Sequence, residues 1–187
     1  MGVGPSAKAS CSRSDYRQTL HFRLRLRAGW QNISAMLSSR TKYGIHALIY
    51  LAQRHGQGFV AIKDISEHER IPRKFLEVIL LDLKGDGLLT SRPGPTGGYA
   101  LRIPPQKLTL GHAVRVLEGP LALTPCVSQG KYEPCVDCRS EAECALRIQM
   151  KKVRDATASI LDEVTFQTLA DEEKQLRVNK LDHSFEI

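Results

Sequence analysis

Apolar residues follow a helical period over 41–54, where they recur three or four positions apart and form one apolar face. The face consists of Ile45, Leu48, Ile49 and Ala52. The pattern predicts an amphipathic helix, which Gly56 and Gly58 end because glycine is typical of the turn that follows a helix. A second helix, short and highly charged, is predicted over 62–69.

A third helix is predicted from Pro72 to about Lys84, because proline suits the first helical position, where an N–H is not needed. Its predicted buried stripe consists of Phe75, Leu76, Ile79, Leu80 and Leu83. Gly85 and Gly87 end it. Two helices joined by a tight turn predict a helix-turn-helix, in which the second helix presents its N-terminal residues to the bases of DNA.

A β-hairpin is predicted next, with strands Leu88–Ser91 and Tyr99–Arg102 around the Gly- and Pro-rich turn 92–98. Three helices followed by such a hairpin are typical of a winged helix-turn-helix, in which the hairpin is the wing. Glycines in a wing allow close approach to phosphate, and Arg92 stands where it could enter the minor groove. The alternative is a plain hairpin that closes a helical domain.

Arginine and lysine can donate hydrogen bonds to guanine, and glutamate can accept one from cytosine, so these residue types on the third helix point to base contacts. We expect double-stranded DNA with a palindromic operator as the partner. The candidate DNA-binding residues are Arg40, Lys42, Pro72, Arg73, Lys74, Glu77, Arg92, Thr96, Gly97, Gly98 and Tyr99.

Two further helices are predicted after the hairpin. Thr109 can cap a short helix that Gly119 and Pro120 end. A long helix follows over 144–169, with an apolar stripe of Leu146, Met150, Val153, Ala156, Ile160 and Val164. One small domain offers little core for such a helix, so we expect it to form a homodimer rather than dock on its own domain. The charged tail, residues 171–187, is expected to be flexible.

The predicted fold is therefore mainly α with a small β-wing, in a chain of 187 residues with a net charge of +7. Residues 1–35 carry six basic residues against one acidic, 36–104 ten against six, and 105–187 eleven against thirteen. The surplus favours a polyanion as partner of the first half. Residues 1–35 have the composition of a disordered arm, a transit peptide or an over-called start. No apolar run approaches a membrane span.

Four of the five cysteines lie close together, spaced Cys126-x8-Cys135-x2-Cys138-x5-Cys144, in a polar loop over 124–145. A loop without its own core brings four thiols together only if something binds them. Soft thiolates select zinc or an iron-sulfur cluster, and this spacing suits either. A reversible thiol switch is a third interpretation. The odd cysteine count and the absence of a secretory signal favour a reducing, cytoplasmic setting.

Several segments resemble the IscR-type family of bacterial winged-helix regulators, also called the Rrf-two family. They are Arg40-Thr-Lys-Tyr-Gly-Ile-His-Ala-Leu, Ile71-Pro-Arg-Lys-Phe-Leu-Glu, Gly87-Leu-Leu and Gly94-Pro-Thr-Gly-Gly-Tyr, within a similarity that spans about 36–169. The resemblance implies a transcription regulator that dimerises through its long helix. It also implies, for members that sense iron, nitric oxide or cluster status, an iron-sulfur cluster ([2Fe-2S] or [4Fe-4S]) on three cysteines, of which Cys126 is the first.

Two positions depart from the resemblance. Some members take a fourth ligand from a carboxylate where this chain has Lys42, and others from a histidine where it has Arg147. We therefore expect Cys135 to complete an all-cysteine site with Cys126, Cys138 and Cys144. The chain divides into the arm 1–35, the winged domain 36–104, the dimerisation and sensor region 105–170, and the tail.

Two other functions stay open at this point. One is a zinc-containing or thiol-switch regulator of the same fold, and the other is a small iron-sulfur accessory or electron-transfer protein that does not bind specific DNA. No enzyme is expected, because the sequence has no paired carboxylates, no phosphate-binding glycine loop beside a strand, and no histidine near a nucleophile in a known motif.

Overall fold

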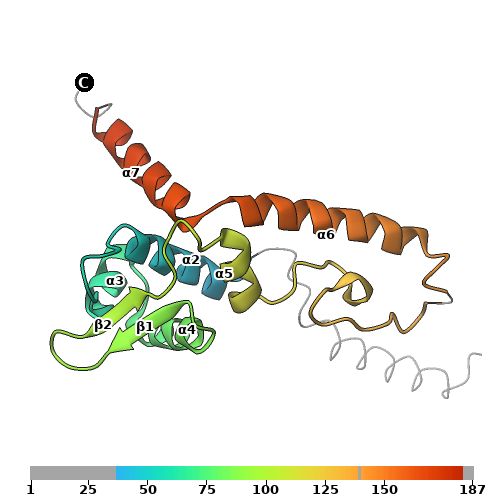
Figure 1. The fold of residues 1–187 in the computed structure, drawn as a ribbon, viewed down its shortest axis with the longest axis horizontal. Helices are drawn as coiled ribbons and strands as arrows, with labels where there is room; N and C mark the ends of the chain where they lie inside the picture. Colours follow the sequence, from blue (N-terminus) through green and yellow to red (C-terminus); the bar gives the residue numbers. More distant parts are fainter. Residues whose placement is uncertain (1–36, 139, 183–187) are drawn as a thin grey trace, which may run out of the picture. The chain divides into compact units, whose positions relative to one another are not determined.

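The structure is a computed structural model that describes residues 37–138 and 140–182, with side chains up to residue 179. Figure 1 shows the order of its elements. They are α2 (Ser39–Ala52), α3 (Ile62–Glu69), α4 (Arg73–Gly85), β1 (Leu89–Arg92), β2 (Gly98–Leu101), α5 (Leu110–Leu117), the short 3₁₀ helix η1 (Pro125–Val127), α6 (Ala145–Glu163) and α7 (Phe166–Asp182). The expectation for residues 1–35 lies outside the described residues. No described helix is long and apolar enough to cross a membrane.

The core lies where α2, α3, α4 and the hairpin meet, with α5 and α7 packed against α2. Buried leucines and isoleucines at helical spacing fill it, which confirms the predicted apolar faces. Phe75 is an exception, because 42% of its surface is exposed and its ring packs edge-on against Tyr43 with centroids 5.8 Å apart. The predicted class, mainly helical with a winged helix-turn-helix, is confirmed.

The turn between α3 and α4 is built by local hydrogen bonds. Arg70 takes a left-handed conformation with φ of 55°, and the Ile71 N–H donates to Ser66 O at 3.0 Å. The Ser66 hydroxyl donates back to Ile71 O at 2.7 Å, and the Ile71 side chain is buried. Pro72 caps α4 from just outside the helix rather than occupying its first turn, a one-residue correction, because its ψ of 125° is extended.

The wing is an antiparallel pair whose register runs from Leu89 opposite Leu101 to Arg92 opposite Gly98. β1 begins and ends one residue later than predicted, and β2 begins and ends one residue earlier. Val60 adds an isolated bridge to Tyr99, with N–H···O bonds of 2.9 Å in both directions. This bridge ties the segment before α3 to the wing and fixes the wing beside the helix-turn-helix.

The long helix predicted over 144–169 is wrong, because the chain breaks into α6 and α7 at Val164 and Thr165. Two strand-like hydrogen bonds replace the helical ones there. The Leu110 N–H donates to Val164 O at 2.8 Å, and the Phe166 N–H donates to Leu108 O at 2.9 Å. Phe166 has no exposed surface, so its burial in the core favours the break.

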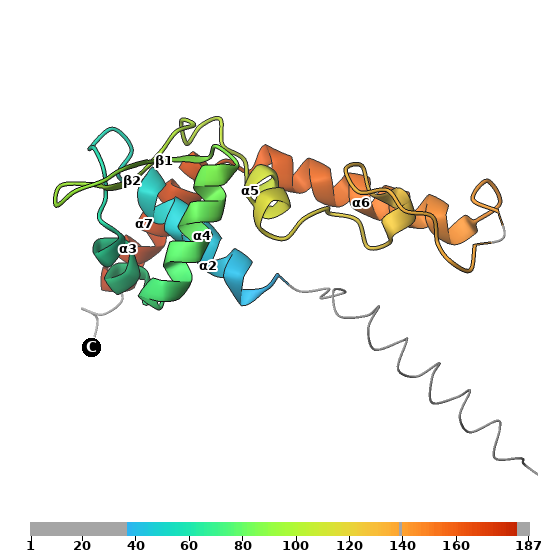
Figure 2. The same cartoon turned by 90° about the horizontal axis from the view of Figure 1, so that it is seen from below.

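The tail expected to be flexible from residue 171 is helical to Asp182. α7 begins with buried Phe166 and Ala170 and packs against α2. Figures 1 and 2 show that it leaves the end of α6 in a different direction from α6. Polar contacts continue beyond the buried residues, since Gln53 donates to Glu173 at 2.7 Å. Residues 183–187 lie outside the described part of the chain.

Candidate DNA-binding surface and cysteine loop

The exposed face of α4 carries the candidate base-reading residues. Pro72, Arg73, Lys74 and Glu77 all lie exposed at or near its N-terminus. Arg73 and Glu77 form an i,i+4 ion pair with 3.3 Å between Arg73 Nε and Glu77 Oε1. Because both side chains are about half exposed or more, the pair is held weakly and its members are available to another partner.

The wing presents Arg92 and Thr96 in exposed positions, while Gly97 is buried and Tyr99 is half-buried. Its two glycines have a steric role that the sequence did not reveal. A Cβ on Gly97 would meet Arg92 O at 2.1 Å, and one on Gly98 would meet Val60 O at 2.0 Å. The backbone atoms of Arg92 and Val60 lie so close to this turn that it requires glycine, whether or not a phosphate binds there.

Arg40 and Lys42, both predicted to contact DNA, have different surroundings. The Arg40 guanidinium donates to Leu117 O at 2.6 Å at the end of α5, and it forms an ion pair with Asp82 on α4. It therefore connects α2, α4 and α5. Lys42 is exposed on α2.

The sequence did not reveal a further anchor of α2, which is Glu118 at the C-terminal cap of α5. Glu118 Oε2 accepts hydrogen bonds from the Ser38 N–H at 3.2 Å, the Ser38 hydroxyl at 2.7 Å and the Thr41 hydroxyl. Partial burial of the carboxyl opposes ionisation, but the hydrogen bonds outweigh it and hold the pKa of Glu118 below its ordinary value. The first turn of α2 is thus joined to the end of α5.

The four clustered cysteines differ in exposure: Cys126 is buried, Cys138 and Cys144 are half-buried, and Cys135 is exposed. A hydrogen bond with Cys126, desolvation and electrostatic interaction with Cys126, Cys138 and Cys144 together raise the pKa of the Cys135 thiol. Within residues 37–138 and 140–182, no three His, Cys, Asp or Glu side chains are already grouped as metal ligands.

The last cysteine is part of a helix terminus. Cys144 is the N-cap of α6, and its sulfur accepts the Arg147 N–H at 3.4 Å. Arg147 Nε is buried without a hydrogen-bond acceptor, although it lies 3.4 Å from Glu141 Oε2. Arg147 therefore contacts the Cys144 sulfur through its backbone N–H, while its guanidinium lies beside the Glu141 carboxylate.

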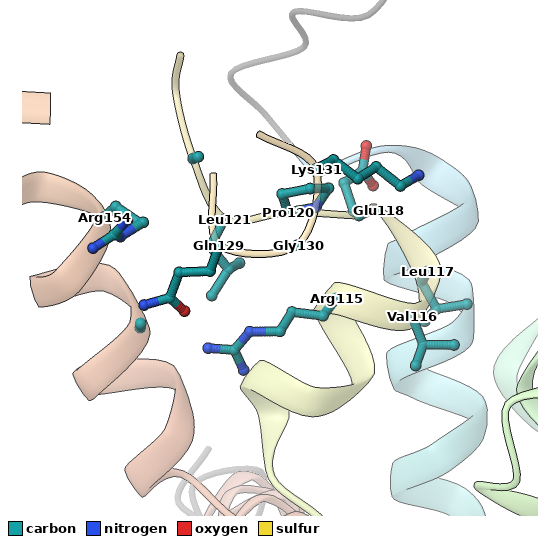
Figure 3. Close-up of a pocket in the computed structure, with 13 residues that line it drawn as sticks. Arg115, Val116, Leu117, Glu118, Pro120, Leu121, Gln129, Gly130, Lys131 and Arg154 are labelled. Atoms are coloured by element: carbon teal, nitrogen blue, oxygen red, sulfur yellow. The ribbon is translucent and has the colours of Figure 1, made fainter. Parts of the chain in front are cut away.

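The loop runs beside α6 (Figures 1 and 2). Arg154 attaches the two, since its side chain is only 12% exposed, donates to Val127 O next to Cys126, and pairs with Asp155. A pocket of about 610 Å³ lies between α5, the loop and α6, and Figure 3 shows the Arg115 and Gln129 side chains within it.

The two arginines that line this pocket, Arg115 and Arg154, are both held by other groups of the protein. Arg115 makes two hydrogen bonds to Asp162 on α6, at 2.6 and 2.8 Å. These bonds raise the pKa of Arg115 and lower the pKa of Asp162. α5 and the loop are therefore each joined to α6 by an arginine, and neither contact has a sequence signal, because the partners are 47 and 27 residues apart.

A sequence profile of the Rrf2 family, described as an iron-dependent transcriptional regulator, matches residues 37–172. The rrf2-like HTH-type regulator of Rhodobacter capsulatus is 34% identical over 137 residues, covering 72% of this chain and 91% of that protein. The solved structure of CymR, the global cysteine regulator of Bacillus subtilis, is similar with a TM-score of 0.61 and 32% identity, covering 73% of this chain and 97% of CymR. IscR of T. potens is similar with a TM-score of 0.58 and 27% identity, covering 75% and 90%.

Proposed function

The chain belongs to the Rrf2 family of transcriptional regulators, and we propose that it is a homodimeric, DNA-binding regulator whose affinity is set by an iron-sulfur cluster on its cysteine loop. The family consists of regulators rather than enzymes, which also argues against an electron-transfer protein. The α3–turn–α4 unit beside a wing is the observation that carries DNA binding. A DNA target and reduced thiols accord with a cytoplasmic location.

In this proposal α4 enters the major groove, with Pro72, Arg73, Lys74 and Glu77 toward the base edges. Arg92 and the wing residues Thr96 to Tyr99 lie at the minor groove or the phosphate backbone. Lys42 contributes a phosphate contact. Arg40 acts mainly within the protein, since Asp82 and Leu117 O occupy its guanidinium.

The apolar stripe of α6 supports a homodimer. No described residue of α6 is buried, and Leu146, Val153 and Ile160 are 61%, 41% and 65% exposed. Large apolar side chains repeated along a nineteen-residue helix are stabilised when a second helix covers them. A two-fold dimer would present two copies of α4 to a palindromic operator.

The cysteine loop fits an iron-sulfur cluster by the chemistry of its donors. Cys126, Cys135, Cys138 and Cys144 would hold the group, which supplies a redox- and nitric oxide-sensitive centre when bound. Metal binding requires the cysteines as thiolates, so it would release protons from the loop. The backbone N–H of Arg147 donates to the Cys144 sulfur, a type of contact that tunes such clusters.

The loop's contacts provide a route from the cysteines to DNA. Val127, next to Cys126, is bonded to Arg154 of α6, and Cys144 caps that same helix. A change in the loop therefore acts on α6 at two points, at Arg154 and at the N-terminal cap formed by Cys144. Movement of α6 in a dimer would alter the separation of the two α4 helices, to which half-site binding is sensitive.

The test is an anaerobic purification followed by iron and sulfide analysis, a visible spectrum and DNA-binding curves with and without the cluster. We expect iron, sulfide, absorbance near about 400 nm, and a change in operator affinity when the cluster is removed. Cys135→Ser should lower the iron content, whereas the control Cys11→Ser should not. Colourless protein without iron or sulfide would reject the cluster.

A thiol switch that pairs Cys135 with Cys126 is the second candidate, and the exposure of the Cys135 thiol together with the similarity to CymR, a cysteine regulator, favours it. Peroxide would oxidise this pair to a disulfide, with loss of two protons and two electrons to the oxidant. Peptide mapping without reductant should then find Cys126 linked to Cys135, and metal analysis should find no iron. Stoichiometric zinc in colourless, air-stable protein would instead identify a structural zinc site.

A further inference from the structure

The outward face of α4 carries two apolar side chains, Val78 and Leu81, that the proposed base contacts do not use. They follow Lys74 at i+4 and i+7, so the three residues lie in one row along the helix. Val78 is 55% exposed and Leu81 is 56% exposed. A recognition helix with polar residues at these positions could hydrogen-bond to bases, but valine and leucine cannot.

A small hollow adjoins Val78 on the same helix. It measures about 330 Å³ and is lined by Arg40, Pro72, Lys74, Phe75, Val78 and Ile79. Phe75 is held there by its edge-on contact with Tyr43. The hollow therefore has an apolar wall beside the positively charged, exposed Lys74, a combination that complements an apolar group attached to a polyanion.

Thymine presents such a group, because its C5-methyl is an apolar feature of the major-groove edge and no other base of DNA carries it. We propose that Val78 recognises a thymine methyl group in the operator, one helical turn beyond the contact made by Lys74. The inference rests on the proposed function, since it requires α4 in the major groove. Val78 thereby acts as a specificity-determining residue that works by contact alone.

The experiment uses the full-length protein to select an operator from random duplexes. Each thymine of that operator is then replaced by deoxyuridine, which removes the methyl group and leaves the base pairing unchanged. Dissociation constants are measured by fluorescence anisotropy at fixed salt. Removing the contacted methyl should weaken wild-type binding about fourfold, the value expected for one buried carbon.

The Val78→Ala variant should bind the thymine and deoxyuridine operators equally at that position. Val78 is exposed, so its truncation leaves the core intact. The matched control is Val178→Ala, which truncates a valine of similar exposure, 51%, on α7. The control should keep the full fourfold difference between the two operators.

Three results would overturn the inference: no thymine methyl matters to the wild type, Val78→Ala still discriminates fully, or Val78→Ala changes the oligomeric state. The third would mean that a protein surface, not DNA, covers Val78. If the wild type selects no operator at all, the proposed function fails together with the inference. A selected operator with unaltered Val78→Ala discrimination rejects the inference alone.

Discussion

Arg40 joins three helices through one guanidinium, so its contribution to stability depends on partners that are distant in the sequence. Its partners Asp82 and Leu117 are 42 and 77 residues away. The sequence alone favoured a DNA contact for Arg40, because an arginine at the start of a winged domain has no local sign of an internal partner. Cys126, Cys135, Cys138 and Cys144 could be identified as a group because their spacing is local.

Arg40→Ala should therefore change the stability of the protein, and Lys42→Ala should change its affinity for DNA. Loss of the Arg40 contacts should lower the free energy of unfolding by about 1 kcal/mol, a modest value because the ion pair is partly exposed. Lys42→Ala should leave stability unchanged, weaken binding to all DNA sequences alike, and reduce the salt slope by about one. Urea denaturation and salt-dependent anisotropy measure the two effects, and equal destabilisation by both variants would contradict the assignment.

Glu118 should make folding sensitive to acid. Its pKa is lowered in the folded protein, so its contribution is present above the ordinary glutamate pKa of 4.5 and is lost as the pH falls through the lower folded value. Glu118→Gln should cost less than about 1 kcal/mol at pH 7 because the carboxylate is exposed to solvent. The difference in free energy of unfolding between Glu118→Gln and the wild type should become smaller below about pH 4.

Urea denaturation of Glu118→Gln and wild type from pH 7 to pH 3 makes the comparison. Glu172→Gln, on the exposed surface of α7, is the matched control and should follow the wild type at every pH. A deficit for Glu118→Gln that stays constant across this range would show that ionisation of Glu118 does not contribute.

At the scale of elements, hydrophobic periodicity predicted every helix of the winged domain to within about two residues and each wing strand to within one. It failed at the boundary between α6 and α7, because helical spacing continues across Val164 while the break is made by hydrogen bonds to Leu108 and Leu110. Those partners lie more than fifty residues earlier. A local sequence pattern cannot predict a helix break that depends on hydrogen bonds to residues so far away in the chain.

The wing turn should be sensitive to a single methyl group at Gly97. Gly97→Ala would place a Cβ against Arg92 O, which cannot yield without moving the hairpin, so we expect a loss of about 1 to 3 kcal/mol and weaker DNA binding. Gly85→Ala meets no atom within 4 Å and should be neutral or slightly stabilising. Thermal unfolding and anisotropy test both, and a Gly97→Ala protein of wild-type stability would contradict the steric argument.

Phe166 should hold α7 to the rest of the fold. Phe166→Ala removes a fully buried ring and should cost about 3 to 5 kcal/mol. Leu176→Ala, at a side chain that is 69% exposed on the same helix, should change stability by less than about 0.5 kcal/mol. Denaturant unfolding compares them, and a mild effect at Phe166 would mean that α7 detaches independently of the core.

At the scale of the whole molecule, the described chain leaves α6 without a partner along its apolar stripe. The sequence predicted this stripe but not its length, because the break before α7 limits the helix to Ala145–Glu163. The contacts that attach the cysteine loop to α6, through Arg154 and the Cys144 cap, required the three-dimensional structure. Long-range arginine contacts of this kind carry no periodicity.

Ile160→Glu should convert the proposed dimer to a monomer, because a charge would be buried at the helix interface without a partner. Sedimentation velocity should show the lower mass, and affinity for a palindromic operator should fall while a single half-site is bound as before. Leu176→Glu places the same charge on exposed α7 and serves as the control. An Ile160→Glu protein that stays dimeric would assign the interface elsewhere.

The cysteine loop stands apart from the residues that hold the fold together. Cys126 and Val127 are buried, yet neither belongs to the core formed by α2, α3, α4, α5 and α7. We therefore expect substitutions at Cys135 and Cys138, which neither cap a helix nor lie buried, to leave the scaffold intact while changing the chemistry that the loop recognises. Such a separation allows the sensing loop of a regulator to change during evolution while the fold of its DNA-binding domain is kept.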